Sequence, residues 1–415
     1  MNSSAPPDPV GSLRALYAAQ VVGSLGLAAG AAAGPLLSQL VTGSAASGSV
    51  ATAALVAGSA VSGPAAAAVM RRSGRMTGVV ACYVAATLGA ALSILSVSWG
   101  FAALVVGSVL LGAGTTGVML GRYAAAEVAG TREASRAIGL AVGAVTFGAV
   151  AGPLLLGPLG PVAELLGLPQ ETSLHLLALV AFPVAAVIGA SLRRRTRPVE
   201  LGPSGRAPGR GWPLAVLATG NLSMVALMGA APTHLHHHGA SLDVVGVVMA
   251  IHIGGMFGFS PASAALARRV GHRRLALIAM VGMAVVMVLG LASGTLVVDV
   301  LLLVLVAMVW NAHLIAGSMW LIEVTPEALR PRAEGLGELA MGAAGALGSL
   351  VIAGVAVALG GLVALCLTLA VLNTAMVALL LLRLRGVEPA DAVVVESPVG
   401  TTPDHEEAPW ETRIR

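Results

Sequence analysis

A few ionisable side chains interrupt long apolar runs of this 415-residue chain. His252 and His313 each lie near the middle of such a run, and Glu338 lies about one turn inside another. If the runs cross a membrane, an ionisable group at this depth is costly and usually faces a partner, a cavity or an ion pathway. An imidazole changes its charge near pH ~6.5, within the range that a proton gradient spans. The three side chains are therefore candidates for proton exchange or substrate binding.

Each of these candidates has a structural alternative. Either histidine can be neutral and hydrogen-bonded within a helix bundle. Glu338, which follows Glu334 by one helical turn, can instead form an ion pair at the end of its helix with Arg71 or Arg72. The sequence leaves both interpretations open.

Three further polar residues lie within apolar runs. Asn221 and Asn311 can line a substrate pocket or hydrogen-bond neighbouring helices. Arg122 can face a cavity, or it can extend its guanidinium group to the membrane surface.

Residues 234–238 read His-Leu-His-His-His at the end of another apolar run. Histidine is a good ligand for transition metals, but this run lacks the carboxylates or cysteines that a dedicated site would add. We expect a solvated loop that tolerates histidine, with no metal site and no cofactor. The chain also lacks lysine and a phosphate-binding glycine loop, and it contains no nucleophile–base set, so neither ATP-driven transport nor an enzyme is expected.

The composition is that of a membrane protein. Hydrophobic residues make up 57% of the chain and charged residues only 10%, with a mean hydropathy of +0.91. A soluble protein of this length needs far more charge to cover its surface. The 53 glycines suit helices that pack closely in lipid.

The positive charges occur in alternate connections between the apolar runs, although the pI of about 9.8 could by itself suggest a nucleic-acid partner. Every basic residue is arginine, and the main groups lie at 71–75, 132–136, 193–210, 268–274, 330–332 and 383–385. This is the distribution of cytoplasmic loops in a membrane protein rather than of a nucleic-acid surface. It predicts a multi-pass protein of the cell (inner) membrane with both termini in the cytoplasm.

Twelve apolar runs are long enough to cross a bilayer as helices, since about 20 residues span its hydrocarbon core. We predict spans at 14–40, 49–70, 77–97, 101–124, 137–158, 172–192, 213–235, 242–264, 274–294, 300–322, 335–358 and 361–383. The connections on the outer side, among them 159–171 and 359–360, contain no arginine. The fold class is therefore an all-α membrane protein.

An internal repeat divides the chain into two halves. Pro64-x-x-Ala67 followed by the arginine group at 71–75 matches Pro261-x-x-Ala264 followed by 268–272 (261 − 64 = 197). Arg-Ala-x-Gly-Leu at 136–140 matches 332–336 (332 − 136 = 196), and Glu127 matches Glu323 at the same offset. Two six-helix halves in parallel repeat are a recurring transporter plan, with the substrate site between the halves.

We therefore predict five segments. Residues 1–12 form a cytoplasmic tail, and residues 13–192 and 213–385 form two pseudo-symmetric six-helix bundles. The Pro- and Gly-rich stretch 193–212 is a cytoplasmic linker, and residues 386–415 form a disordered acidic cytoplasmic tail.

Residues 13–385 resemble the major facilitator superfamily (MFS). The loops after the second and eighth spans are similar to the signature loop of the family, with Arg71, Arg72, Gly74 and Arg75 matched by Arg268, Arg269 and Gly271, although arginine replaces the family's aspartate in both copies. The fifth span resembles the antiporter motif of the drug/proton exporters through Gly139, Gly148, Gly152, Pro153 and Gly157. The fourth span departs from them, because Ser108 stands where those exporters carry an arginine.

The resemblance implies a monomeric secondary transporter that works by alternating access. We expect proton-coupled export of a small amphipathic molecule. The glycine–proline motif of the fifth span either takes part in conformational exchange or only packs and kinks the helix. One alternative is proton-coupled uptake of a small metabolite, which the histidines of the second half favour. Another is a transport-inactive membrane receptor or assembly factor. The partners expected are a small-molecule substrate, protons and the lipid bilayer, without nucleic acid.

Overall fold

The computed structural model describes residues 9–28, 33–44, 47–192, 209–237 and 242–385, and these residues are almost entirely helical. The α-helices are α1 (Pro9–Ala28), α2 (Gly34–Thr42), α3 (Ser47–Ser73), α4 (Arg75–Trp99), α5 (Phe101–Ala129), α6 (Ala134–Leu154), α7 (Leu156–Leu165), α8 (Ser173–Ser191), α9 (Gly211–His237), α10 (Leu242–Gly258), α11 (Ser260–Val270), α12 (His272–Leu289), α13 (Leu296–Glu323), α14 (Arg330–Leu347) and α15 (Gly354–Arg385). A π-helical segment, Gly348–Ala353, joins α14 to α15.

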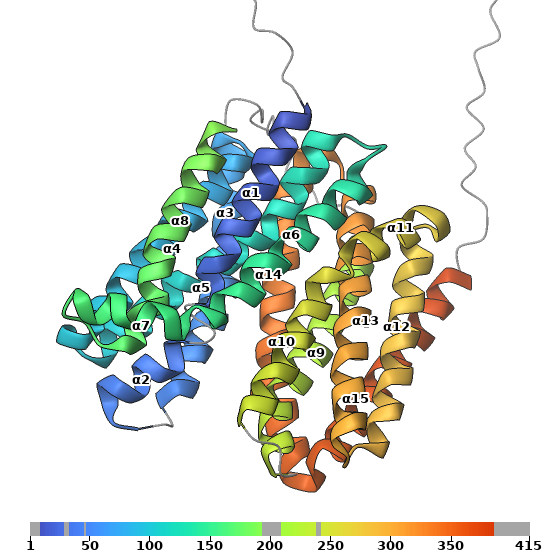
Figure 1. Cartoon of the computed structure of the whole chain (residues 1–415). Coiled ribbons are helices and arrows are strands. Elements are labelled where there is room, and N and C mark those ends of the chain that lie inside the picture. Colours follow the sequence, from blue (N-terminus) through green and yellow to red (C-terminus); the bar gives the residue numbers. More distant parts are fainter. Residues whose placement is uncertain (1–8, 29–32, 45–46, 193–208, 238–241, 386–415) are drawn as a thin grey trace, which may run out of the picture.

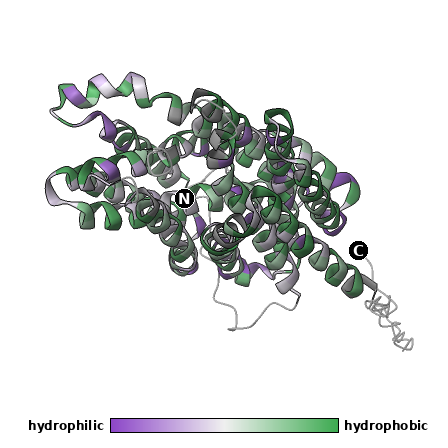
Figure 2. Ribbon diagram, turned by 90° about the horizontal axis from the view of Figure 1, so that it is seen from below, coloured by the Kyte–Doolittle hydropathy of each residue, from purple (hydrophilic) through white to green (hydrophobic). Residues whose placement is uncertain are grey.

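Eleven segments of the described chain are long and apolar enough to cross a membrane, and they overlap eleven of the twelve predicted spans. The remaining predicted span, 14–40, corresponds to α1 and α2. Residues 29–32, between these two helices, lie outside the described residues. The prediction of an all-helical membrane protein is confirmed. Hydrophobic residues dominate nearly every helix in Figure 2, and large apolar side chains such as Phe147 and Val187 are exposed, as expected for lipid contact.

Prolines account for two differences from the predicted boundaries. The fifth span ends at Leu154 rather than at 158, one residue after Pro153, and the short helix α7 covers the end of that predicted span and the first part of the predicted outer loop 159–171. The eighth span is divided into α10 and α11 at Phe259, just before Ser260 and Pro261. A proline has no backbone N–H to continue a helix, but it fits the first turn of a new one.

The helices form two bundles, α1–α8 and α9–α15, which lie side by side in Figure 1. Helix α1 begins at Pro9, so the predicted boundary of the N-terminal tail falls inside a helix. Most of the predicted linker and all of the predicted C-terminal tail lie outside the described residues. The connections α3–α4, α5–α6, α11–α12 and α13–α14 share one end of the molecule, at the top of Figure 1, and we call it the arginine-rich end.

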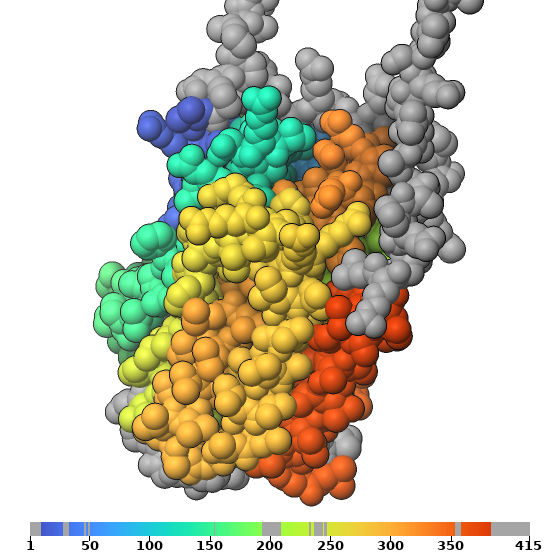
Figure 3. Space-filling model, turned by 90° about the vertical axis from the view of Figure 1, so that its right-hand side faces the viewer, coloured from blue at the N-terminus to red at the C-terminus, as the bar shows by residue number. Residues whose placement is uncertain are grey.

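The two bundles meet through two contacts that the internal repeat relates. In the α3–α14 contact, a Cβ atom added to Gly335 would lie 2.7 Å from Cβ of Ala67. In the α6–α11 contact, a Cβ added to Gly139 would lie 2.5 Å from Cβ of Ala264. Figure 3 shows the second contact from outside, with α6 in teal against α11 in yellow. The residues that define the repeat are therefore those that let the two halves touch.

Candidate functional site

Arg75 joins the two halves at the arginine-rich end. It is the first residue of α4, and Gly74 before it has φ +87°, a conformation that favours glycine and allows the abrupt turn from α3 into α4. Its guanidinium group donates to Glu127 of α5 and to Glu334 of α14. The side chains of Arg75 and Glu334 are 4% and 2% exposed, so this ion pair between the halves is buried.

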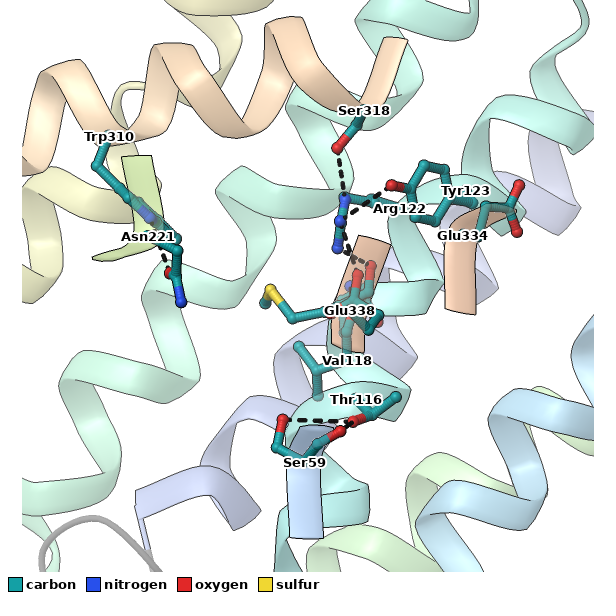
Figure 4. A network of polar contacts seen from close by, with 12 residues as sticks. Ser59, Thr116, Val118, Arg122, Tyr123, Asn221, Trp310, Ser318, Glu334 and Glu338 are labelled. Carbon is teal, nitrogen blue, oxygen red and sulfur yellow. Dashed lines mark hydrogen bonds and ion pairs between the residues drawn. The ribbon is translucent and has the colours of Figure 1, made fainter. Parts of the chain in front are cut away.

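A second buried ion pair lies one turn deeper on α14. Nη2 of Arg122, on α5, donates to Oε1 of Glu338 at 2.8 Å, and the two side chains are 0% and 4% exposed (Figure 4). Nε of Arg122 donates to Oγ of Ser318 on α13 at 2.9 Å, and Nη2 also contacts the hydroxyl of Tyr123 at 3.2 Å. Ser318 is the repeat equivalent of Arg122 (318 − 122 = 196), so this cation has no counterpart in the second half.

The positions of these carboxylates follow from helix geometry. Glu334 and Glu338 are four residues apart and lie on the same face of α14. That face points toward the first half, where α5 and the start of α4 supply one arginine for each carboxylate. Both pairs form only while the halves are together, and removing one partner leaves the other charge buried and uncompensated in that arrangement, at a cost of about 3–5 kcal/mol.

The α6–α11 contact contains a weaker version of this arrangement. His272 begins α12 as Arg75 begins α4, after Gly271 with φ +84°. Its Nδ1 lies 3.3 Å from Glu323, the repeat equivalent of Glu127, and its Nε2 lies 3.0 Å from Oγ of Ser135 on α6. His272 is 22% exposed and Glu323 is 51% exposed, so solvent screens this pair.

A cavity of about 500 Å³ lies between the two contacts at the arginine-rich end. Its lining combines apolar groups with four carboxylates and three basic side chains, and the residues are Arg75, Tyr123, Ala126, Glu127, Gly130, Thr131, Ala134, His272, Met319, Ile322, Glu323, Glu327, Arg330 and Glu334. Such a lining can receive a small molecule that has both polar and apolar parts.

The two predicted histidines are buried within the second half. Nδ1 of His252, on α10, lies 2.8 Å from the carbonyl oxygen of Leu303 on α13. Nδ1 of His313 lies 2.9 Å from the carbonyl oxygen of Val309 in its own helix. Among the described residues Nε2 of neither histidine has a hydrogen-bond partner, and neither ring is hydrogen-bonded to Glu338. The three candidates therefore do not form one connected group.

The two predicted asparagines connect helices. Nδ2 of Asn221 donates to the carbonyl oxygen of Met341 at 2.7 Å, and Oδ1 accepts from Nε1 of Trp310 at 3.1 Å. Asn311 donates to the carbonyl oxygen of Met256 at 2.7 Å and to the hydroxyl of Ser260. Asn221 thus links α9 to α13 and α14, and Asn311 links α13 to α10 and α11.

The glycines of the predicted conformational motif have different surroundings. Gly139 is at the α6–α11 contact between the halves, whereas Gly148 packs against Ser24 and Leu25 of α1 within the first half. Gly152 is buried in the last turn of α6, where Pro153 also lies. Gly157 falls on α7, and a Cβ added there would meet nothing within 4 Å, so the motif does not act through tight packing at this position.

The signature loops end α3 and α11. Arg71 and Arg72 lie in the last turn of α3, and Arg268 and Arg269 lie in the last turn of α11. Glu338 pairs with Arg122 and not with Arg71 or Arg72, so that suggested ion pair is wrong. The interpretation in which Arg122 extends to the membrane surface is also wrong, because its side chain is 0% exposed.

The sequence alone does not single out the acidic partners of Arg75. The signature loop lacks its usual aspartate, but Glu127 and Glu334, from two other helices, supply carboxylates at this place. The repeat match of Glu127 with Glu323 and the closeness of Glu334 to Glu338 are the only signals that point to them.

Comparisons with known proteins agree with this architecture. The family model of the Major Facilitator Superfamily matches residues 211–412. The chain is 28% identical over 363 residues to the uncharacterized MFS-type transporter YddS of Bacillus subtilis (strain 168), covering 81% of this chain and 83% of YddS. A second protein of that organism, the uncharacterized MFS-type transporter YdeG, is 29% identical over 363 residues, with coverage of 81% and 84%.

Solved structures give the same fold. The crystal structure of the human organic anion transporter MFSD10 (TETRAN) superposes with a TM-score of 0.70 at 17% identity, covering 90% of this chain and 100% of that one. Two related halves in contact are an architecture in which transporters alternate access to their substrate site. The chain is thus similar in sequence to MFS-type transporters over most of its length, and its fold is that of a solved transporter.

Proposed function

We propose that this protein is a proton-coupled exporter of small amphipathic molecules whose arginine-rich end lies in the cytoplasm. The observation that carries the proposal is the buried Arg122–Glu338 pair, because it joins the halves and contains a group that can take up a proton. The loops at this end carry the arginines, and cytoplasmic loops are enriched in positive charge.

The pair gives a physical route for coupling. A proton that arrives from the outer side neutralises Glu338, removes the counter-charge of Arg122 and weakens the closed arrangement. When the cytoplasmic end opens, water reaches Glu338, the carboxyl group ionises again, and its proton leaves to the cytoplasm. The charged carboxylate then returns to Arg122 and closes that end, with substrate enclosed. Protons thus move inward while substrate moves outward.

Two observations support export of an amphipathic molecule. The motif from Gly139 to Pro153 is similar to that of the drug/proton exporters. The cavity at the arginine-rich end places Tyr123, Met319 and Ile322 beside carboxylates, so a substrate entering there meets both kinds of surface. Proton-coupled uptake is the second candidate, because the buried His252 and His313 lie within the second half and each has a ring nitrogen without a partner among the described residues.

The test is transport by the full chain in liposomes with an imposed pH gradient and a panel of small substrates. We expect parent protein to move substrate opposite to the protons, and Glu338→Gln to lose accumulation against a gradient while retaining downhill exchange. The matched control is Glu164→Gln, an exposed carboxylate on α7, which should transport like the parent. His252→Gln and His313→Gln are measured alongside.

The outcomes separate the candidates. Movement of substrate in the same direction as the protons favours uptake. Accumulation by Glu338→Gln equal to that of the parent contradicts the coupling role, and loss of accumulation in a histidine variant alone moves that role to the second half.

A further inference from the structure

A third ionisable pair, in which the carboxylate is buried, lies in the second half near the end opposite the arginine-rich one. Asp299 is in the first turn of α13 and is 1% exposed. Its Oδ2 lies 3.4 Å from Nε2 of His234, in the last turns of α9, and His234 is 16% exposed. The predicted spans leave Asp299 in an outer loop, and they give the histidine run at 234–238 no role.

The surroundings of Asp299 are apolar. Leu227, Leu302, Leu303 and Leu362 line the space around the pair, together with Ala231 and Leu235, and they leave no room for a water molecule there. Neither carboxylate oxygen of Asp299 has a hydrogen-bond partner among the described residues. A carboxylate in such a place is costly when charged, unless a cation accompanies it.

We propose that His234 and Asp299 form a proton-binding site that is loaded from the outer side of the membrane. With one shared proton the pair is neutral overall, whether that proton is bonded to Nε2 of His234 or to Oδ2 of Asp299. Without it, an aspartate charge is buried alone, and a second proton removes the negative charge of Asp299 that faces the imidazolium. The pair therefore holds one proton while α9 and α13 are packed together, and it exchanges that proton when they separate.

The proton reaches the site through His234. Its side chain is the more exposed member of the pair, and it begins the histidine run that ends α9. Of the elements packed around Asp299, α15 contributes one other titratable side chain within the described chain, the buried thiol of Cys366. The N-terminus of α13 adds a partial positive charge near the carboxylate. Asp299 lies at the end of α13 opposite the arginine-rich end, whereas Glu338 lies about two turns from the start of α14 at the arginine-rich end, so the inference stands whether or not Glu338 carries the coupling proton.

Infrared difference spectroscopy of the full chain in liposomes, recorded as the external pH is changed, observes the protonation of carboxyl groups directly. We expect a carboxyl band that responds to the external pH and that is absent from Asp299→Asn. Selective ¹³C labelling of aspartate in the unmodified chain, which has five aspartates, should shift this band, so the assignment does not depend on how the variant folds.

Two further variants complete the test. His234→Gln should move the midpoint of the band, because the carboxyl group loses its cation. Glu164→Gln, on the outer surface of the other half, should leave the band unchanged. The proposal is overturned if aspartate labelling shifts no pH-responsive band, or if the midpoint in His234→Gln equals that of the parent.

Discussion

The two contacts between the halves have the same backbone plan but different chemistry. Ala67 and Gly335 meet in the α3–α14 contact as Ala264 and Gly139 meet in the α6–α11 contact, and the repeat relates the two. Beside the first, Arg75 bonds Glu127 and Glu334 in buried surroundings. Beside the second, a histidine bonds one half-exposed carboxylate and one serine hydroxyl.

The difference indicates that the two contacts have different roles. Arginine keeps its charge at every accessible pH, so the α3–α14 contact is a permanent electrostatic link. An imidazole is charged only when protonated, and the partner of His272 is screened by solvent, so the α6–α11 contact is weaker and adjustable. Arg122 and Glu338 add a second buried link on the α14 side. We therefore expect α14 to be the last element to part from the first half.

The largest effect is expected from breaking the permanent link. Arg75→Ala leaves Glu334 buried and unpaired and should disfavour the closed arginine-rich end by about 3–5 kcal/mol. With one cysteine placed in each half at this end, the yield of cross-linking between the two cysteines measures how far the end is closed. Arg136→Ala, which removes a surface pair that is 67% and 59% exposed, is the control and should cross-link like the parent. Equal cross-linking in Arg75→Ala would contradict the assignment.

The deeper pair should be energetically coupled. Arg122→Gln and Glu338→Gln each leave one buried charge alone, whereas the double variant leaves none. The double variant should therefore be more stable than the sum of the single effects predicts, by about 0.5–3 kcal/mol. Thermal unfolding of the purified variants in detergent measures this coupling, and strict additivity would show that the pair is not a unit.

Small residues at the contacts provide a steric test. The Cβ of Gly139→Ala would lie 2.5 Å from Ala264 and 2.9 Å from the carbonyl oxygen of Ser260, an overpacking that costs about 1–3 kcal/mol. We expect the variant to fold but to open more readily at the arginine-rich end, as measured by labelling of a cysteine in the cavity. Gly157→Ala, with nothing within 4 Å, should behave like the parent. Equal labelling of both variants would contradict the role of Gly139.

The smallest effect is expected at His272. His272→Ala removes a screened pair and should weaken closure by less than about 1 kcal/mol. His272→Arg should make the second contact resemble the first, because an arginine keeps its charge. The same cross-linking tests both variants.

Much of this fold could be predicted from the sequence because lipid imposes simple rules. Apolar length defines the spans, and arginine groups mark one end of the molecule. The repeat anchors Ala67, Ala264, Gly139 and Gly335 are the residues at which the halves meet, so packing preserved through the duplication could be recognised from spacing alone.

The site could be predicted only in part. Glu338 and Arg122 stand out as charges in apolar runs, but their pairing crosses 216 residues of sequence, and no local pattern encodes it. The same holds for Arg75 with Glu334 and for His234 with Asp299. Asp299 lies at the edge of an apolar run, where composition cannot tell a solvated loop residue from the buried first turn of a helix.

We propose that buried ion pairs between the halves hold the arginine-rich end closed. Double electron–electron resonance measures the distance between spin labels on Arg132→Cys and Arg332→Cys, which are exposed positions in the first and the second half. The measurement is made in lipid nanodiscs after Cys82 and Cys366 are replaced by alanine, and it tests this proposal directly. The parent should show one short distance, and Arg75→Ala and Glu338→Gln should each gain a longer one, with the larger gain in Arg75→Ala. Identical distance distributions in all three proteins would contradict the account.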